Sequence, residues 1–243
     1  MRLTFKLNPE YVFLHAINMS QYSEPFLGWS RFTNNIWEKD RVVFYFLAGA
    51  PEYILFVPSL AAKRDLIKKT EKEFKKIKQS KEYKRIVSET KNYLSFVKSQ
   101  WECNEKIALN FLQEIYGATL PKLNIRVYIT HPKLRNGMAL DEHTIVWGHS
   151  EDFRNYSTVY LAHELLHILT HFDRSDIAHA IIELAADEEL RIRLNKKGKY
   201  FEYPGHRHLL SVKKKILPYW KKYLREEKKD IFTFIKDMKR KWG

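Results

Sequence analysis

Residues 163–167 read His-Glu-Leu-Leu-His, and their types and spacing can support metal-dependent chemistry. Two histidines that are four positions apart on a helix project from one face, one turn above the other. The imidazoles of His163 and His167 can therefore share one zinc ion, and Glu164 can take a proton from a water molecule that the ion activates. The pattern predicts a helix beneath this segment and a further metal ligand elsewhere in the chain.

A second segment, residues 183–187, reads Glu-Leu-Ala-Ala-Asp and offers that ligand. A tight helix–loop–helix connection would bring Glu183 to the level of His167. Its carboxylate would complete the two-histidine, one-glutamate set of a catalytic zinc site, with the fourth position left for water. Asp187 lies one turn beyond Glu183. Its carboxylate can accept a hydrogen bond from the far nitrogen of a ligating histidine, which would fix the tautomer of that ring.

Together the two segments resemble the gluzincin zinc metallopeptidases, which combine HExxH with a downstream ExxxD on a so-called glutamate helix. The short spacing between the segments is most similar to the compact minigluzincins. The resemblance covers about residues 104–194. It implies an α+β fold with a zincin-like catalytic domain, built from a backing helix, a small sheet, an active-site helix and a glutamate helix.

The resemblance also implies an activity and a role for each motif residue. The expected activity is peptide-bond hydrolysis by a zinc metalloendopeptidase, with Zn²⁺ as cofactor and a peptide or protein as substrate. The gluzincin pattern places the metal ligands at His163, His167 and Glu183, the general base at Glu164, and the support for a ligating histidine at Asp187. The Gly-Ala-Met-Glu-Asn motif of exopeptidases is absent from the sequence, which weakens an aminopeptidase assignment.

Other ligand assignments stay open. Asp173 follows His167 by six positions, where metzincins place their third ligand, but Thr170 stands where those enzymes need a glycine. His171 and His179 are also near enough to bind or support the metal. Full zinc occupancy in a Glu183→Ala variant would exclude Glu183 as a ligand.

Hydrolysis also needs a hydrogen-bond donor to the developing oxyanion, in addition to the metal. Tyr203, Arg207 and two further histidines follow the predicted glutamate helix, and among them His206 and His208 are the first candidates. The same residues are equally consistent with a basic surface turn.

Zincin clefts usually bind the substrate backbone along an edge strand above the motif helix, and residues 143–148 are in the right place for that strand. A peptide would then be bound by strand addition. We therefore predict substrate contacts at Val146, Trp147 and Gly148. Trp147 is equally consistent with a place in the core.

The elements around these residues follow from hydrophobic periodicity. Residues 61–100 predict two amphipathic helices, and residues 104–116 predict a further helix that ends at Gly117. A boundary near residue 100 would divide the chain into a mainly helical N-terminal region of unknown role, residues 1–100, and a zincin-like metallopeptidase domain, residues 101–243.

Strands and the two motif helices follow in the second part. Alternating apolar residues predict a strand over residues 123–130, and Asn-Gly at residues 136–137 predicts a turn before the strand at 143–148. The motif helix is expected over residues 157–171 with Ser157 as its N-cap. The glutamate helix is expected over residues 176–194 with Ser175 as its N-cap.

Length and composition limit the cellular context. A chain of 243 residues can form one large domain or two small ones. Cys103 is the only cysteine, so no internal disulfide can form, which fits a reducing cytoplasm. The N-terminus shows no apolar run of signal-peptide length, and prolines interrupt the longest apolar region, residues 42–62. We expect a cytoplasmic protein without a membrane span.

The net charge of +14 and the pI of about 9.6 allow a nucleic-acid partner, which we do not favour. Lysines in residues 63–85 and 213–241 are interleaved with glutamates and apolar residues, as on solvated helix faces. The alternatives to the protease are a nucleic-acid-associated zinc protein or protease, or a regulatory protein with a gated or vestigial zinc site. DNA binding with a steep salt dependence would support the nucleic-acid alternative.

Overall fold

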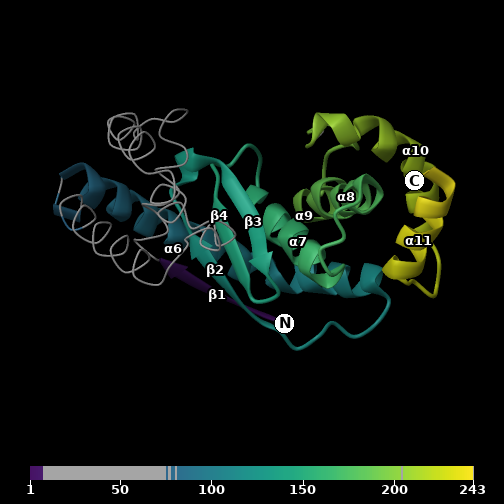
Figure 1. Ribbon diagram of the computed structural model, residues 1–243, viewed down its shortest axis with the longest axis horizontal. Helices are drawn as coiled ribbons and strands as arrows, with labels where there is room; N and C mark the ends of the chain where they lie inside the picture. Colours follow the sequence, from purple (N-terminus) through teal and green to yellow (C-terminus); the bar gives the residue numbers. More distant parts are fainter. Residues whose placement is uncertain (8–74, 76–77, 80, 204, 243) are drawn as a thin grey trace, which may run out of the picture.

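The structure, a computed structural model, describes residues 1–7, 75, 78–79, 81–203 and 205–242. It shows an α+β fold in which a small mixed sheet lies beside a group of helices (Figure 1). Most of the first amphipathic helix predicted within residues 61–100 lies outside the described residues.

The described sheet has the strand order β1-β2-β4-β3. Its strands are β1 (Arg2–Leu7), β2 (Asn124–Ile129), β3 (Asn136–Asp141) and β4 (Thr144–Gly148). β2 pairs in parallel with β1 and β4, and β3 runs antiparallel to β4, so β1 and β3 form the edges. We did not predict β1, because its six residues give no sign of a parallel partner so far along the chain.

The strands predicted at residues 123–130 and 143–148 are confirmed. On β2, Ile125, Val127 and Ile129 are buried and alternate with less buried neighbours. All five residues of β4 are buried, as expected for a strand that is enclosed on both faces.

Two predictions about this part of the sheet are wrong. β4 lies between β2 and β3, so residues 143–148 cannot be an edge strand for substrate. Residues 136–137 begin β3 and do not form a turn. The hairpin turns at residues 142–143 instead, where Asp141 Oδ1 accepts a hydrogen bond from the His143 backbone N–H at 2.7 Å. An aspartate that bonds the backbone two residues ahead favours a turn, and Asn-Gly masked that signal.

A single helix, α6 (Lys81–Tyr116), covers the region where we predict separate helices before residue 100 and after residue 104. Its apolar stripe continues through the buried side chains of Val97 and Trp101, so the polar residues nearby mark an outer face and not a break. A division of the chain after residue 100 would fall inside this helix. α6 packs against β1, β2 and α7 (Figure 1).

Gly117 ends α6 as predicted, and the fold leaves no room for a side chain there. Its φ is +77°, and a Cβ atom at this position would lie 1.6 Å from the backbone oxygen of Lys229. Gly117→Ala is expected to lower the free energy of unfolding by at least about 1–2 kcal/mol, the approximate cost of the left-handed conformation alone. Urea unfolding would measure it. The control Ala118→Ser, at an exposed position, should stay within about 0.5 kcal/mol of wild type. Equal stability of both variants would contradict the described close approach.

The motif helix is α7 (Tyr156–Leu169), and Ser157 is not its N-cap. The cap is Asn155, which has a left-handed φ of 63° and makes no side-chain capping bond. The Ser157 hydroxyl accepts a hydrogen bond from Trp147 Nε1 at 2.9 Å and donates one to Glu151 Oε1 at 2.5 Å. With these partners the hydroxyl ties α7 to β4 and to the preceding loop.

The predicted glutamate helix is one helical stretch in three parts. They are α8 (Asp176–Glu183), the π-helical segment η2 (Leu184–Leu190) and α9 (Arg191–Asn195). Ser175 is the N-cap, as predicted, and its Oγ accepts a hydrogen bond from the Ala178 backbone N–H at 3.2 Å. The π-helical segment was not predicted. Such segments are frequent at functional sites, and this one contains Asp187.

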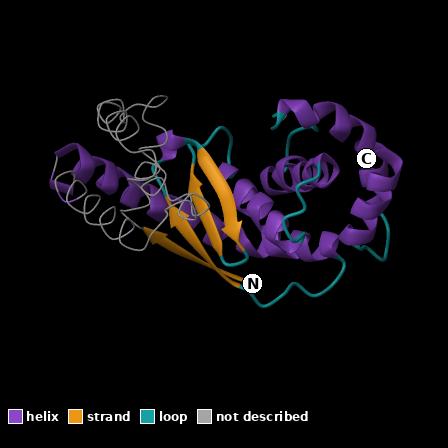
Figure 2. Ribbon diagram, in the orientation of Figure 1, coloured by secondary structure: helices purple, strands orange, loops and turns teal. Residues whose placement is uncertain are grey.

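The C-terminal part adds two longer helices and completes the set of described elements. They are α10 (Leu210–Tyr223) and α11 (Ile231–Trp242), and the short helix η3 (Arg207–Leu209) precedes them. The other short helix, η1 (Pro132–Leu134), lies between β2 and β3. Both α10 and α11 pack against α8, so α7 lies between the strands on one side and these helices on the other (Figure 2). Of the described helices, none combines the length and apolar character that a membrane crossing requires.

Candidate metal centre

The two motif histidines face each other on α7. His163 Nε2 and His167 Nε2 are 3.2 Å apart. A tetrahedral zinc ion at about 2.0–2.1 Å from each nitrogen would hold two ligand atoms about 3.3 Å apart. The spacing therefore fits two imidazoles that share one ion.

Asp187 fixes the orientation of the first histidine. Its Oδ1 atom is 2.9 Å from His163 Nδ1, and both side chains are buried, so the predicted contact is present. Burial alone would lower the pKa of His163, but the charge and hydrogen bond of Asp187 outweigh it and raise the pKa to about 9. A proton on Nδ1 that points to a carboxylate leaves Nε2 to face the metal position.

His179, on α8, is the third imidazole of this cluster. Metal-binding atoms of His163, His167 and His179 all lie within 4.8 Å of one another. His179 Nε2 is buried and has no hydrogen-bond partner. Burial and the neighbouring imidazoles lower the pKa of His167 to about 3 and that of His179 to about 4. Both rings are therefore neutral near pH 7 and keep a lone pair for a metal.

Glu183 is fully buried and has close partners on both carboxylate oxygens. Oε1 accepts hydrogen bonds from the His206 backbone N–H at 3.1 Å and from His206 Nδ1 at 2.6 Å. Oε2 is 2.5 Å from the buried ammonium of Lys213, on α10. Burial would raise the pKa of Glu183, but the bonds from His206 and Lys213 lower it to about 2. Glu183 forms a second possible metal group with His179 and His206, not with the motif histidines.

Glu164 lies beside the histidine pair and under the sheet edge. Its Oε2 atom accepts a hydrogen bond of 2.7 Å from the backbone N–H of Ala139 on β3. Burial raises the pKa of the Glu164 carboxyl. The Ala139 N–H therefore points away from β4 and toward the motif helix, so the edge of β3 that pairs with no described strand faces α7.

A pocket of about 490 Å³ opens in front of these groups. His163, Glu164 and His206 line it together, as do Tyr203 and Arg207. Three of the four oxyanion-donor candidates from the sequence therefore lie at the same pocket as the motif helix. This arrangement brings a base candidate, a donor candidate and His163 of the metal cluster to one cavity.

The predicted substrate-binding residues of β4 differ in their positions. Trp147 lines the pocket and also packs in the core, where its ring stacks on Tyr160 with centroids 5.8 Å apart. Val146 is fully buried, and Gly148 packs so closely that a Cβ atom there would lie 2.1 Å from Thr130 Oγ1. Neither Val146 nor Gly148 lines the pocket.

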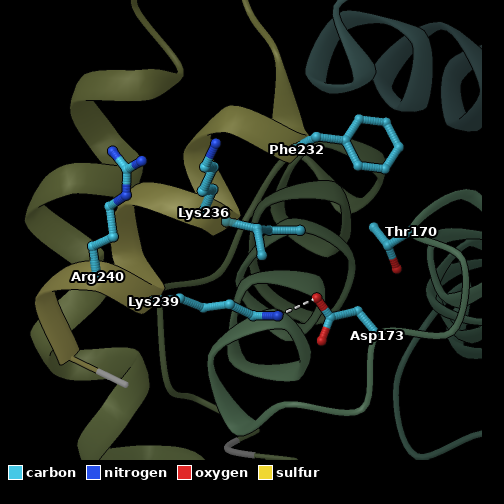
Figure 3. A pocket seen from close by; sticks show the side chains of 7 residues that line it. Thr170, Asp173, Phe232, Lys236, Lys239 and Arg240 are labelled. Atoms are coloured by element: carbon cyan, nitrogen blue, oxygen red, sulfur yellow. Dashed lines mark hydrogen bonds and ion pairs between the residues drawn. The ribbon is translucent and has the colours of Figure 1, made fainter.

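The other ligand candidates from the sequence have partners away from the cluster. Asp173 points to Lys239 in a different pocket, between the end of α7 and α11, and its Oδ2 lies 2.5 Å from Nζ (Figure 3). The ring of His171 stacks on Phe232, with centroids 5.7 Å apart. His208 is exposed and contacts the ring of His206 but does not line the main pocket.

Sequence reasoning missed two residues of the site. Tyr160 follows the helical spacing of the motif, since it precedes His163 by one turn, and its ring stacks on that histidine at 5.7 Å between centroids. That spacing was a usable signal. Lys213 carried none, because it is one lysine among many in a basic helix and only the tertiary fold brings it to Glu183.

Asp187→Asn is expected to lower zinc affinity by about 10–100-fold, the usual effect of neutralising a carboxylate behind a ligating histidine. Competition with a chromophoric chelator would measure the affinity. The control is Asp152→Asn, which removes a carboxylate from the pocket wall and should leave affinity unchanged. Equal affinities of Asp187→Asn and wild type would show that this carboxylate does not support a metal ligand.

Comparisons with protein-family models, with curated proteins and with solved structures find no significant match for the chain. A function must therefore be argued from the geometry itself. That geometry consists of a close histidine pair, a buried glutamate beside it, and a pocket lined by His163 and that glutamate.

Proposed function

We propose that the protein is a zinc-dependent metalloendopeptidase with a zincin-like catalytic domain, whose two motif segments resemble those of the gluzincins. The observation that carries the proposal is the 3.2 Å spacing of His163 Nε2 and His167 Nε2, with Glu164 in the same cleft. The two nitrogens can share a hydrogen bond at this distance, and an ion bound by both would replace that bond at nearly the same spacing. The buried, unpartnered nitrogen of His179 beside them supports the same conclusion.

The donor atoms present fit zinc, because the cluster offers three imidazoles with ligand atoms within 4.8 Å of one another, of which His167 and His179 are neutral near pH 7, and contains no cysteine. His163 and His167 would hold the ion, with a third ligand from α8, on which both His179 and Glu183 lie. A bound zinc ion would polarise the scissile carbonyl and make a water molecule more acidic.

Glu164 is the general base of the proposed reaction. The bond from the Ala139 N–H holds its carboxylate at the pocket wall, one residue away from a metal ligand. The carboxylate accepts the proton of the attacking water and passes it to the leaving amine. His206, held by Glu183 through Nδ1, would donate to the developing oxyanion from Nε2 in its protonated form, and the bond to Glu183 favours that form by raising the pKa of His206.

The proposed substrate is an extended peptide that pairs with β3. β3 is an edge of the described sheet, and its Ala139 N–H, which bonds Glu164, shows that the side away from β4 faces α7. Met138 and Leu140 on this strand are exposed, so apolar substrate side chains would find partners there. Strand addition would supply main-chain hydrogen bonds directly above the metal cluster.

The test combines metal content with proteolysis of an unstructured protein. The purified full chain is expected to contain about one zinc per molecule and to cleave casein. Removal of the metal with 1,10-phenanthroline should abolish cleavage, and added Zn²⁺ should restore it. A His171→Ala variant, altered outside the cluster, should keep both zinc and activity. Cleavage that survives complete metal removal would refute the proposal.

A further inference from the structure

The third metal ligand can be assigned from the contacts on α8. Two side chains compete for that role, His179 and Glu183, and they stand one turn apart on the same helix. This question rests on the proposed function, because it concerns which residues would complete the proposed zinc site. The answer decides the charge of the site and leaves one of the two residues free for another task.

Glu183 is already committed to other partners. Its Oε1 atom accepts two hydrogen bonds from His206, and its Oε2 atom lies 2.5 Å from the Lys213 ammonium. Glu183 and Lys213 are both fully buried. Metal binding by this carboxylate would pull it away from a buried cation, which is strongly unfavourable in an interior of low polarity.

The interatomic spacing also separates the two groups of possible ligands. Two atoms bound to one tetrahedral zinc ion lie about 3.3 Å apart. The motif histidines meet that value, with 3.2 Å between His163 Nε2 and His167 Nε2. Glu183 Oε1 and His206 Nδ1 are only 2.6 Å apart, which is the length of a charge-assisted hydrogen bond. The contact between Glu183 and His206 therefore orients an imidazole and does not prepare a metal site.

His179, in contrast, has no hydrogen bond to its Nε2 atom. That atom is buried, and Glu183 Oε1 is 3.9 Å from it, too far for a hydrogen bond. Its ring centroid lies 4.9 Å from that of His167 and 5.4 Å from that of His163. A buried polar atom without a partner is destabilising unless something binds it, and a metal ion shared with the motif histidines would do so.

We infer that His163, His167 and His179 form a three-histidine zinc site, and that Glu183 is a positioning residue that holds His206 toward the cleft. In this arrangement Lys213 neutralises Glu183. The zinc site then keeps its full positive charge, because no carboxylate binds the ion. Glu183 acts on the reaction only through His206.

The direct test is X-ray absorption at the zinc edge of the full-length, zinc-loaded protein, which counts imidazole ligands by their multiple scattering. Three imidazoles are expected. Two imidazoles with an added carboxylate oxygen would overturn the inference and leave the proposed protease function intact. Absence of bound zinc would refute the proposed function itself, so the two failures are distinguishable.

Variants provide a second readout that does not depend on activity. His179→Ala should lower zinc affinity by at least about 100-fold, more than the usual loss of a supporting carboxylate. The double variant Glu183→Gln/Lys213→Met removes both charges of the buried pair together and should change zinc affinity by less than about 10-fold. Its cleavage of casein should nevertheless fall, through kcat, because an amide oxygen holds His206 by a neutral hydrogen bond that is weaker than the bond to a carboxylate. The reverse order of the two affinities would show that Glu183 is the ligand.

Discussion

Glu164→Gln is expected to lower the rate of casein cleavage by about 10²–10⁴-fold, the usual contribution of a general base. The amide has nearly the same shape and can still accept the hydrogen bond from the Ala139 N–H with its oxygen. It cannot take a proton from water, so the loss should appear in kcat. The zinc content should equal that of wild type, because Glu164 is not a proposed ligand.

The matched control for this variant is Glu142→Gln, which makes the same chemical change at an exposed turn. It should retain full activity and full zinc content. Unchanged cleavage by Glu164→Gln would remove the mechanism. Loss of zinc together with activity would instead show that Glu164 holds the metal cluster in shape, and the base would have to be sought elsewhere on the pocket wall.

Local sequence spacing was enough for the parts of this site that lie on one helix or on two helices joined by a short turn. His163 and His167 meet because a helix repeats every four residues, and Ser175 predicted the start of the second helix through its capping bond. Asp187 was also predicted to reach a histidine, and it does. The π-helical segment that carries it has no comparable sequence signal.

Contacts between distant segments could not be predicted. β1 pairs with β2, although most of the first half of the chain separates the two strands. The six residues of β1 give no information on which strand is its partner. The Asn-Gly pair at residues 136–137 is a strong turn signal, yet pairing with β4 makes it part of the edge strand. The second error moved the predicted substrate edge from β3 to β4.

The role of Glu183 also depends on contacts with distant segments that the sequence does not predict. Its motif position predicts a metal ligand, but its side chain is held by Lys213 and His206, which come from later elements. A lysine in a basic helix is normally exposed to solvent, so the sequence predicts an exposed Lys213 and not a buried ion pair. Only the packing of α10 against α8 reveals that this one is enclosed.

The buried pair makes the largest stability prediction for this chain. Lys213→Met should lower the free energy of unfolding by about 3–5 kcal/mol, because removal of one partner leaves the other charge buried and uncompensated. Urea unfolding at neutral pH, with chelator present to exclude a contribution from metal, would measure the loss. The double variant Glu183→Gln/Lys213→Met is the control and should recover part of it, since Glu183 is then uncharged and Glu188, whose Oε1 lies 3.7 Å from Lys213 Nζ, keeps its contact with Arg191. A loss below about 1 kcal/mol in Lys213→Met would mean that the Glu183 carboxylate does not depend on Lys213. Glu183 would then be free to turn toward the ion, and the three-histidine assignment would lose its main support.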